Sequence, residues 1–172
     1  MRRPESSFNT EPQWFVAHTR PRAEKKLAHY CDREGFTNEL PTVRTVRKYQ
    51  RKICKFDNPL FPGYLFLRIN PASKQKVFQS DYCARIIQVN LQDEFEQQLR
   101  DILQAVRYAE DNEIILCPSI TEGLRVRIKS GPLTGLEGVV ARREGISNVH
   151  LNLDFIGQSA IVKLEASRLE AT

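Results

Sequence analysis

The stretch NPLFPGYLFLRI, residues 58–69, joins a proline-glycine turn to a strand that has no polar face. Tyr64, Leu65, Phe66 and Leu67 follow one another without a polar residue, whereas a strand with one face in water alternates apolar and polar side chains. Such a strand is either buried on both faces or covered on one face by another protein. Alternation places Leu65 and Leu67 on one face and Tyr64 and Phe66 on the other, so the question is what covers the second face.

Strand and helix patterns alternate on both sides of this stretch. Periodicity and capping residues predict strands at 14–19 and 84–89, a basic strand pair over 43–56, a helix that runs from Ala23 and ends at Gly35, a short helix capped by Asn70, and an amphipathic helix over 93–108. This order is typical of an α+β domain in which helices pack on an antiparallel sheet. We expect this domain to span residues 13–109, after a disordered lead-in at 1–12.

A different pattern follows residue 118. Strand signals recur at short spacing in LRVRIK, GVVARR, SNVHLNL and SAIVKL, with a last short edge near Arg168–Leu169. Gly131-Pro132 and Gly135 predict a turn between the first two strands, and Gly138 predicts a bulge or a close backbone approach. Five short strands of this kind predict a small β-barrel over 119–172, joined to the first domain by a linker at 110–118.

The composition narrows the class of protein. Its 41% hydrophobic and 27% charged residues are typical of a globular chain, and its apolar runs are far shorter than the roughly 18–20 residues that span a bilayer. The N-terminus lacks the apolar core of a secretory signal. Four cysteines without a C-x-x-C pair disfavour zinc ligation and a disulfide framework. We therefore expect a cytoplasmic monomer without metal, cofactor or membrane contact.

Motifs that would indicate catalysis are missing from the sequence. It contains no G-x-S-x-G, Walker loop, G-x-G-x-x-G or H-E-x-x-H motif, and the three histidines stand apart from any Ser or Cys nucleophile motif. The carboxylates are scattered or lie on predicted helix faces. We expect no enzymatic activity.

The net charge of +5 is carried by the first part of the chain. Residues 1–110 hold 19 Lys and Arg against 13 Asp and Glu, whereas residues 111–172 hold 7 against 8. A polyanion is therefore expected to bind the first part. On the first helix, one positive stripe lies about 100° around the axis from the apolar stripe; with the preceding arginine it comprises Arg20, Arg22, Lys26, His29 and Arg33.

A second basic cluster lies in VRTVRKYQRKICK, residues 43–55, which contains six Lys and Arg and no acidic residue. One interpretation is an ordinary solvated face. The other is a phosphate-binding surface, because the like charges repel one another unless an anion is near, and Tyr49 could stack on a base. The candidate nucleic-acid-binding residues of this cluster are Arg44, Arg47, Lys48, Arg51 and Lys52.

Two motifs together resemble a known family. GLRVRIKSGPLTGLEGVV is similar to the KOW motif, and FPGYLFL, about 60 residues upstream and after WFVAHT, is similar to the core of the NusG N-terminal domain. In this order they cover nearly all of residues 13–172 and resemble the NusG/RfaH family of bacterial transcription elongation factors. The resemblance implies an N-terminal domain that binds RNA polymerase, followed by an SH3-like KOW barrel.

The resemblance also implies binding sites. The clamp of RNA polymerase would dock in an apolar depression on the N-terminal sheet, and the first helix would face the non-template DNA strand through Arg20, Lys26 and Arg33. The residues that match positions lining or backing the depression are His18, Phe61, Tyr64, Phe66 and Val89. Of these, His18 and Val89 stand where the family often has aromatic residues.

The KOW barrel of this family binds proteins, either the termination factor Rho or a small-subunit ribosomal protein. The residues expected at that contact are Leu151, Leu153, Phe155 and Ile156, and Ile156 replaces a phenylalanine typical of housekeeping members. This departure favours a specialised paralogue that antiterminates selected operons. The alternative is a KOW-containing, RNA-binding protein associated with the ribosome, which the near-neutral charge of the second part disfavours.

Overall fold

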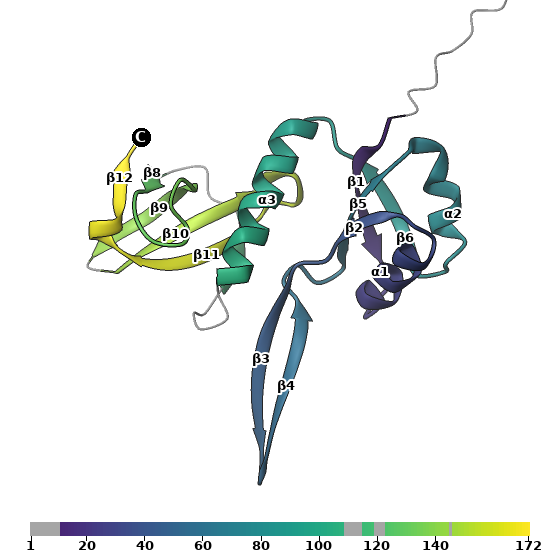
Figure 1. The fold of residues 1–172 in the computed structure, drawn as a ribbon, viewed down its shortest axis with the longest axis horizontal. Helices are drawn as coiled ribbons and strands as arrows, with labels where there is room; N and C mark the ends of the chain where they lie inside the picture. The colour runs from purple at the N-terminus through teal and green to yellow at the C-terminus, as the bar shows by residue number, and fades with distance from the viewer. Residues whose placement is uncertain (1–10, 109–114, 119–122, 145) are drawn as a thin grey trace, which may run out of the picture. The chain divides into compact units, whose positions relative to one another are not determined.

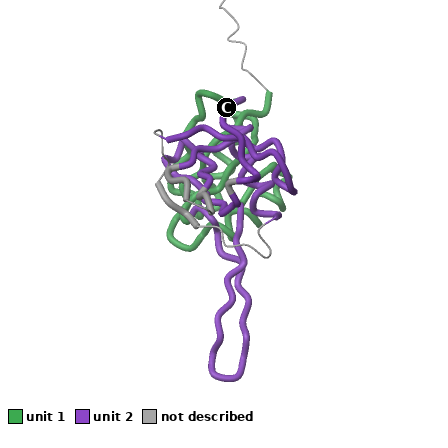
Figure 2. The backbone as a smooth tube through the Cα atoms, turned by 90° about the vertical axis from the view of Figure 1, so that its left-hand side faces the viewer, with its two compact units in different colours: residues 1–40, 62–92 green, residues 41–61, 93–172 purple. Residues whose placement is uncertain are grey.

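The computed structural model describes residues 11–108, 115–118, 123–144 and 146–172. Figure 2 shows two compact units, residues 1–40 with 62–92 (unit 1) and residues 41–61 with 93–172 (unit 2). Residues 1–10 of the expected lead-in and 110–114 of the expected linker lie outside the described residues. None of the described helices is long and apolar enough to span a bilayer.

Unit 1 is a four-stranded antiparallel sheet with two α-helices (Figure 1). The strand order is β2-β5-β1-β6. Its elements, in chain order, are β1 (Gln13–Thr19), α1 (Glu24–Arg33), β2 (Thr37–Glu39), β5 (Tyr64–Ile69), the 3₁₀ turn η1 (Pro71–Ser73), α2 (Lys74–Phe78) and β6 (Cys83–Gln88). The predicted strands, the first helix and the short helix are thereby confirmed, and the Asn70 side chain accepts from the Ala72 N–H at 2.9 Å as its cap.

One face of this sheet and the two helices enclose the core of unit 1. Leu65 and Leu67 of β5 lie with Phe15 of β1, Leu27 of α1 and Val77 of α2, and all five are fully buried. The helix stops where predicted, because Gly35 has φ +76°, a left-handed conformation that glycine adopts without steric cost. The α1 helix therefore buries its apolar stripe and leaves the basic stripe outward.

Unit 2 contains a hairpin, a long helix and a six-stranded sheet. The hairpin pairs β3 (Thr42–Tyr49) with β4 (Lys52–Pro59) and forms a sheet of its own. The helix is α3 (Gln92–Tyr108), which buries Phe95, Leu99, Ile102 and Ala105 on one stripe. The sheet strands are β7 (Ile115–Pro118), β8 (Leu124–Ile128), β9 (Glu137–Glu144), β10 (Ile146–Leu153), β11 (Gln158–Glu165) and β12 (Leu169–Ala171). The 3₁₀ turns η2 (Asp154–Ile156) and η3 (Ala166–Arg168) flank β11.

The six-stranded sheet differs in part from the predicted barrel. The five predicted strands are present, and Ile115–Pro118, placed in the expected linker, adds a sixth strand that pairs with β11. The order β12-β8-β9-β10-β11-β7 leaves β12 and β7 as edges, so no closed barrel is observed among the described residues. The close approach predicted at Gly138 is confirmed, because a Cβ there would lie 2.8 Å from the His150 carbonyl oxygen.

Candidate docking face and nucleic-acid interface

One row of side chains crosses three neighbouring strands on the sheet face opposite the one that packs against α1 and α2. His18 of β1 lies directly opposite Tyr64 of β5 on one side and Arg85 of β6 on the other, and residues opposite one another share a face. The His18 and Tyr64 ring centroids are 5.4 Å apart with a tilt of 55°. His18 and Arg85 are exposed and Tyr64 is half-buried. We call these three residues the docking row.

A turn at the start of β5 positions the docking row. Gly63 has φ +86°, its carbonyl oxygen accepts from the Thr19 N–H at 2.8 Å, and its own N–H donates to the Glu24 Oε1 at 2.7 Å. Glu24 is only 8% exposed, so this hydrogen bond is shielded from water and fixes the turn to the start of α1. A Cβ on Gly63 would lie 3.6 Å from the His18 Nε2, which shows how closely the turn packs against the row.

The five predicted polymerase-binding residues divide by exposure. His18 and Tyr64 reach the surface within the docking row. Phe61, Phe66 and Val89 are between 0% and 2% exposed, so their side chains are not available to form an exposed docking surface.

Three residues that support or extend this face were missed by sequence reasoning. Arg85 joins the row only through strand pairing, and Glu24 acts across 39 residues of chain. Gln92 holds the start of β1, because its Oε1 accepts from the Trp14 N–H at 2.6 Å and its Nε2 donates to the Trp14 carbonyl at 2.9 Å. A period-3.6 or period-2 pattern contains no signal for such contacts between residues far apart in sequence.

The predicted basic stripe of unit 1 is exposed along and before α1. Arg20, Arg22, Lys26, His29 and Arg33 all have exposed side chains. The Lys26 Nζ lies 6.0 Å from the Tyr82 ring centre and the Arg33 guanidinium 5.6 Å from the Tyr30 ring centre. These cation–π contacts leave the positive charges in place for an anionic partner.

The predicted basic cluster of unit 2 occupies the β3–β4 hairpin. Its five candidate residues, Arg44, Arg47, Lys48, Arg51 and Lys52, are all exposed. Arg44 is paired with Asp57 at 3.3 Å. The hairpin also exposes four large apolar side chains, Val46, Tyr49, Ile53 and Phe56, at 44–64%, and of these only Tyr49 was predicted to face a ligand.

The predicted partner-binding residues of the second part lie on β10 and the following turn. Leu151 and Leu153 are buried at 2% and 0% exposure, whereas Phe155 and Ile156 are half-buried. The Phe155 ring meets the Phe95 ring of α3 edge-on, with centroids 5.9 Å apart. Phe155 and Ile156 are therefore the members of this set that a partner can reach.

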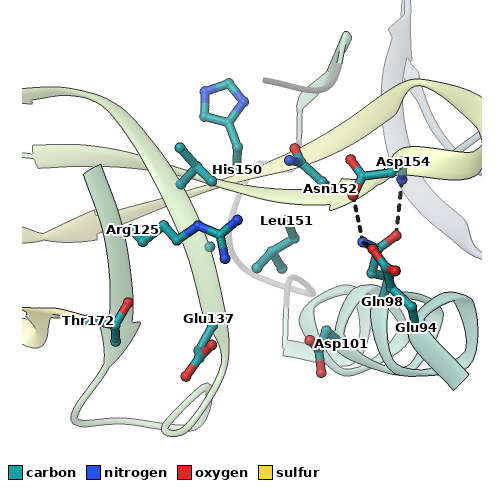
Figure 3. Close-up of a pocket in the computed structure, with 12 residues that line it drawn as sticks. Glu94, Gln98, Asp101, Arg125, Glu137, His150, Leu151, Asn152, Asp154 and Thr172 are labelled. Atoms are coloured by element: carbon teal, nitrogen blue, oxygen red, sulfur yellow. Dashed lines mark hydrogen bonds between the residues drawn. The ribbon is translucent and has the colours of Figure 1, made fainter. Parts of the chain in front are cut away.

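A polar cavity of about 220 Å³ lies between α3 and the strands of unit 2 (Figure 3). At one side of the cavity, the Gln98 side chain donates to the Asp154 Oδ2 at 2.7 Å and accepts from the Asp154 N–H at 3.0 Å. Burial raises the pKa of Asp101. On the strand side, burial lowers the pKa of His150, whose Nδ1 is 3.2 Å from the Ser159 Oγ. The two Gln98–Asp154 hydrogen bonds join α3 to the turn that follows β10. The described residues include no group of three or more His, Cys, Asp or Glu able to hold a metal ion.

A protein-family model agrees with the resemblance in the sequence. Residues 12–113, more than half of the chain, match the family model NusG, described as "Transcription termination factor nusG". No curated protein gives a significant sequence match. A Thermotoga maritima structure, "Domain interaction in Thermotoga maritima NusG", is 20% identical, covers 93% of this chain and 97% of its own, and has a TM-score of 0.48. A structure of the MjSpt4:Spt5 complex is 15% identical, covers 92% and 96%, and has a TM-score of 0.30.

Proposed function

The chain belongs to the NusG family, and we propose that it is a transcription elongation and antitermination factor that binds RNA polymerase through the docking row. The observation that carries this proposal is the docking row itself, the exposed His18 and Arg85 with the half-buried Tyr64, on the sheet face opposite the one that packs against α1 and α2. An aromatic residue and an arginine are the residue types most often found at the centre of protein interfaces. The partner is the clamp of the polymerase, as the family resemblance implies.

The basic stripe on α1 supports contact with the non-template DNA strand. Its basic side chains are exposed along and just before α1, and such a row of cations binds phosphates without reading bases. Phe155 and Ile156 support a protein partner for the second part of the chain, either Rho or a small-subunit ribosomal protein. The protein itself is proposed to be non-enzymatic and to act through these contacts.

Capture of purified bacterial RNA polymerase by the immobilised protein tests the proposal. Tyr64→Ala is expected to weaken capture by about 30-fold or more, the effect of losing an interface residue worth about 2 kcal/mol. Phe78→Ala is the matched control, because Phe78 is also an exposed aromatic residue of unit 1, at 43%, but lies on α2. Unchanged capture by a folded Tyr64→Ala variant would refute the assignment of the docking row.

In vitro transcription provides the functional measurement. The wild-type protein is expected to shorten polymerase pauses, and Tyr64→Ala is expected to lose this effect together with polymerase capture. Adding Rho to the same reaction tests antitermination, since an antitermination factor lowers the yield of Rho-terminated transcripts. A protein that captures polymerase but changes neither pausing nor termination would contradict the proposed activity.

A further inference from the structure

The β3–β4 hairpin has two chemically different faces. Pairing sets Thr45 opposite Phe56, Arg47 opposite Cys54 and Tyr49 opposite Lys52, and opposite residues share a face. We call these six residues the aromatic face. The intervening pairs form the aliphatic face: Arg44 with Asp57, Val46 with Lys55 and Lys48 with Ile53.

The apolar side chains on both faces of the hairpin are exposed, unlike those of a core strand. The Tyr49 and Phe56 rings are 51% and 44% exposed, and Val46 and Ile53 on the other face are 54% and 64% exposed. β3 and β4 pair only with each other among the described strands (Figure 1). An isolated two-stranded sheet is marginally stable in water, so exposed apolar side chains on it indicate a surface that a ligand covers.

The charge of the hairpin indicates the ligand. Residues 43–55 contain six Lys and Arg and no carboxylate, and the flanking Asp57 is engaged by Arg44 at 3.3 Å. The other five cations have no acidic partner among the described residues. Charge complementarity therefore favours a polyanion over an ordinary protein surface.

We propose that the aromatic face binds a single DNA strand, with Tyr49 and Phe56 stacking on two unpaired bases and Arg47 and Lys52 contacting the phosphates between and beside them. This inference rests on the proposed contact with non-template DNA and assigns it a second surface. The two rings are separated by about 14 Å, four residues along a strand at about 3.4 Å each, so they stack on separate bases.

The geometry favours unpaired bases over a duplex. A ring can stack on the flat face of a base only where that face is free, and in a duplex each base is already stacked on its neighbours. On the same face, the Asn58 amide donates to the Thr45 Oγ1 at 2.7 Å, so one donor and one acceptor of this face already bond each other. The comparison of oligodeoxythymidine with oligouridine tests whether a ribose 2′-hydroxyl adds to binding.

Matched double variants test the face. Tyr49→Val with Phe56→Val removes both rings but keeps strong strand formers, and Val46→Thr with Ile53→Thr makes an equivalent change on the aliphatic face. The affinity of the full chain is measured for labelled oligodeoxythymidine of about 12 nucleotides, for a duplex of the same length and for oligouridine.

The ring-removing variant is expected to bind the DNA strand at least about 30-fold more weakly, which corresponds to two stacked bases at about 1 kcal/mol each or more. The aliphatic-face variant is expected to bind like wild type. Equal losses in the two variants, no loss on removing the rings, or tighter binding of duplex or RNA than of single-stranded DNA would each overturn the proposal.

Cys54 provides an independent readout on the same face, between Phe56 and Lys52 along β4. Its alkylation, followed by peptide mass spectrometry, is expected to slow when the DNA strand is bound, with the buried Cys31 and Cys83 as internal references. An unchanged alkylation rate at saturating DNA would also overturn the proposal. Neither assay contains polymerase, so this result is independent of the polymerase capture that tests the proposed function.

Discussion

Replacing Glu24 tests whether the turn before β5 is held by one shielded hydrogen bond. The carboxylate accepts from the Gly63 N–H at 2.7 Å and is 8% exposed. In Glu24→Ala the donor stays in place and loses its acceptor, so the variant loses a charge-assisted hydrogen bond and leaves the part-buried Gly63 N–H without this partner. The expected loss in the free energy of unfolding is about 1.5–3 kcal/mol.

Urea unfolding followed by tryptophan fluorescence measures this loss. Trp14 is the only tryptophan of the chain and lies on β1, 7% exposed, so it reports on unit 1. With a slope of about 1–3 kcal/mol per molar urea, the midpoint of Glu24→Ala is expected to fall by about 1 M. Glu24→Gln keeps an acceptor oxygen and is expected to lose less, about 1 kcal/mol.

The urea midpoints of Glu24→Ala and Glu24→Gln together test the role of this hydrogen bond. A midpoint of Glu24→Ala equal to that of wild type would refute the claim that this hydrogen bond holds the turn. Equal losses in Glu24→Ala and Glu24→Gln would show that the acceptor oxygen is not what matters. Polymerase capture should weaken in Glu24→Ala under conditions in which the protein stays folded, because Tyr64 directly follows the turn.

Three further predictions concern close packing, pH and thiol reactivity. Gly138→Ala is expected to lower the free energy of unfolding by about 1–3 kcal/mol, because its Cβ would lie 2.6 Å from a Val149 methyl group and 2.8 Å from a carbonyl oxygen. Circular dichroism in increasing urea should show a lower unfolding midpoint for the second part of the chain. Burial lowers the pKa of His150, so the unfolded state binds more protons as pH falls below about 6.5. Wild type should therefore lose melting temperature between pH 7.5 and 5.5, and His150→Gln should lose less. Burial raises the thiol pKa of Cys31 to about 12, so its alkylation should be far slower than that of Cys54; comparable rates would contradict the buried placement.

Local patterns predicted β1, β5, β6 and both α-helices of unit 1, but not the three-residue strand β2, because each predicted element depends on neighbouring residues. The run around Leu65 gave a strand, the spacing of Leu27 with Ala23 gave a helix face, and Asn70 gave a cap, and the structure confirms all three. Each signal repeats within one or two turns of helix or a few residues of strand, so tertiary context did not change it.

The sheet of unit 2 shows where local patterns are insufficient. Ile115–Pro118 is a short apolar run beside the expected linker, and four residues carry too little alternation to mark a strand. It becomes a strand because β11 presents a free edge for it to pair with. Whether a short segment adds a strand to the edge of a sheet therefore depends on its pairing partner, and local sequence does not show that partner.

The hairpin shows a different limit. The apolar residues Val43, Val46, Ile53 and Phe56 among basic residues correctly indicated a strand pair. Apolar side chains in a strand usually lie on a buried face. Here no layer covers either face, so both apolar sets remain exposed. The pattern fixes which residues share a face but not whether anything covers that face.

The strand β5 has one face that is buried and one face that is partly open. Leu65 and Leu67 are buried by the helices of unit 1, as expected of a core strand. On the second face Phe66 is also fully buried, and only Tyr64 is partly open, next to the exposed His18. Replacing Phe66 would therefore remove a packed side chain worth about 3–5 kcal/mol, and loss of polymerase capture in such a variant would follow from unfolding as readily as from a lost contact. The assignment of the docking row consequently depends on Tyr64 and His18, whose side chains can be changed without opening the core.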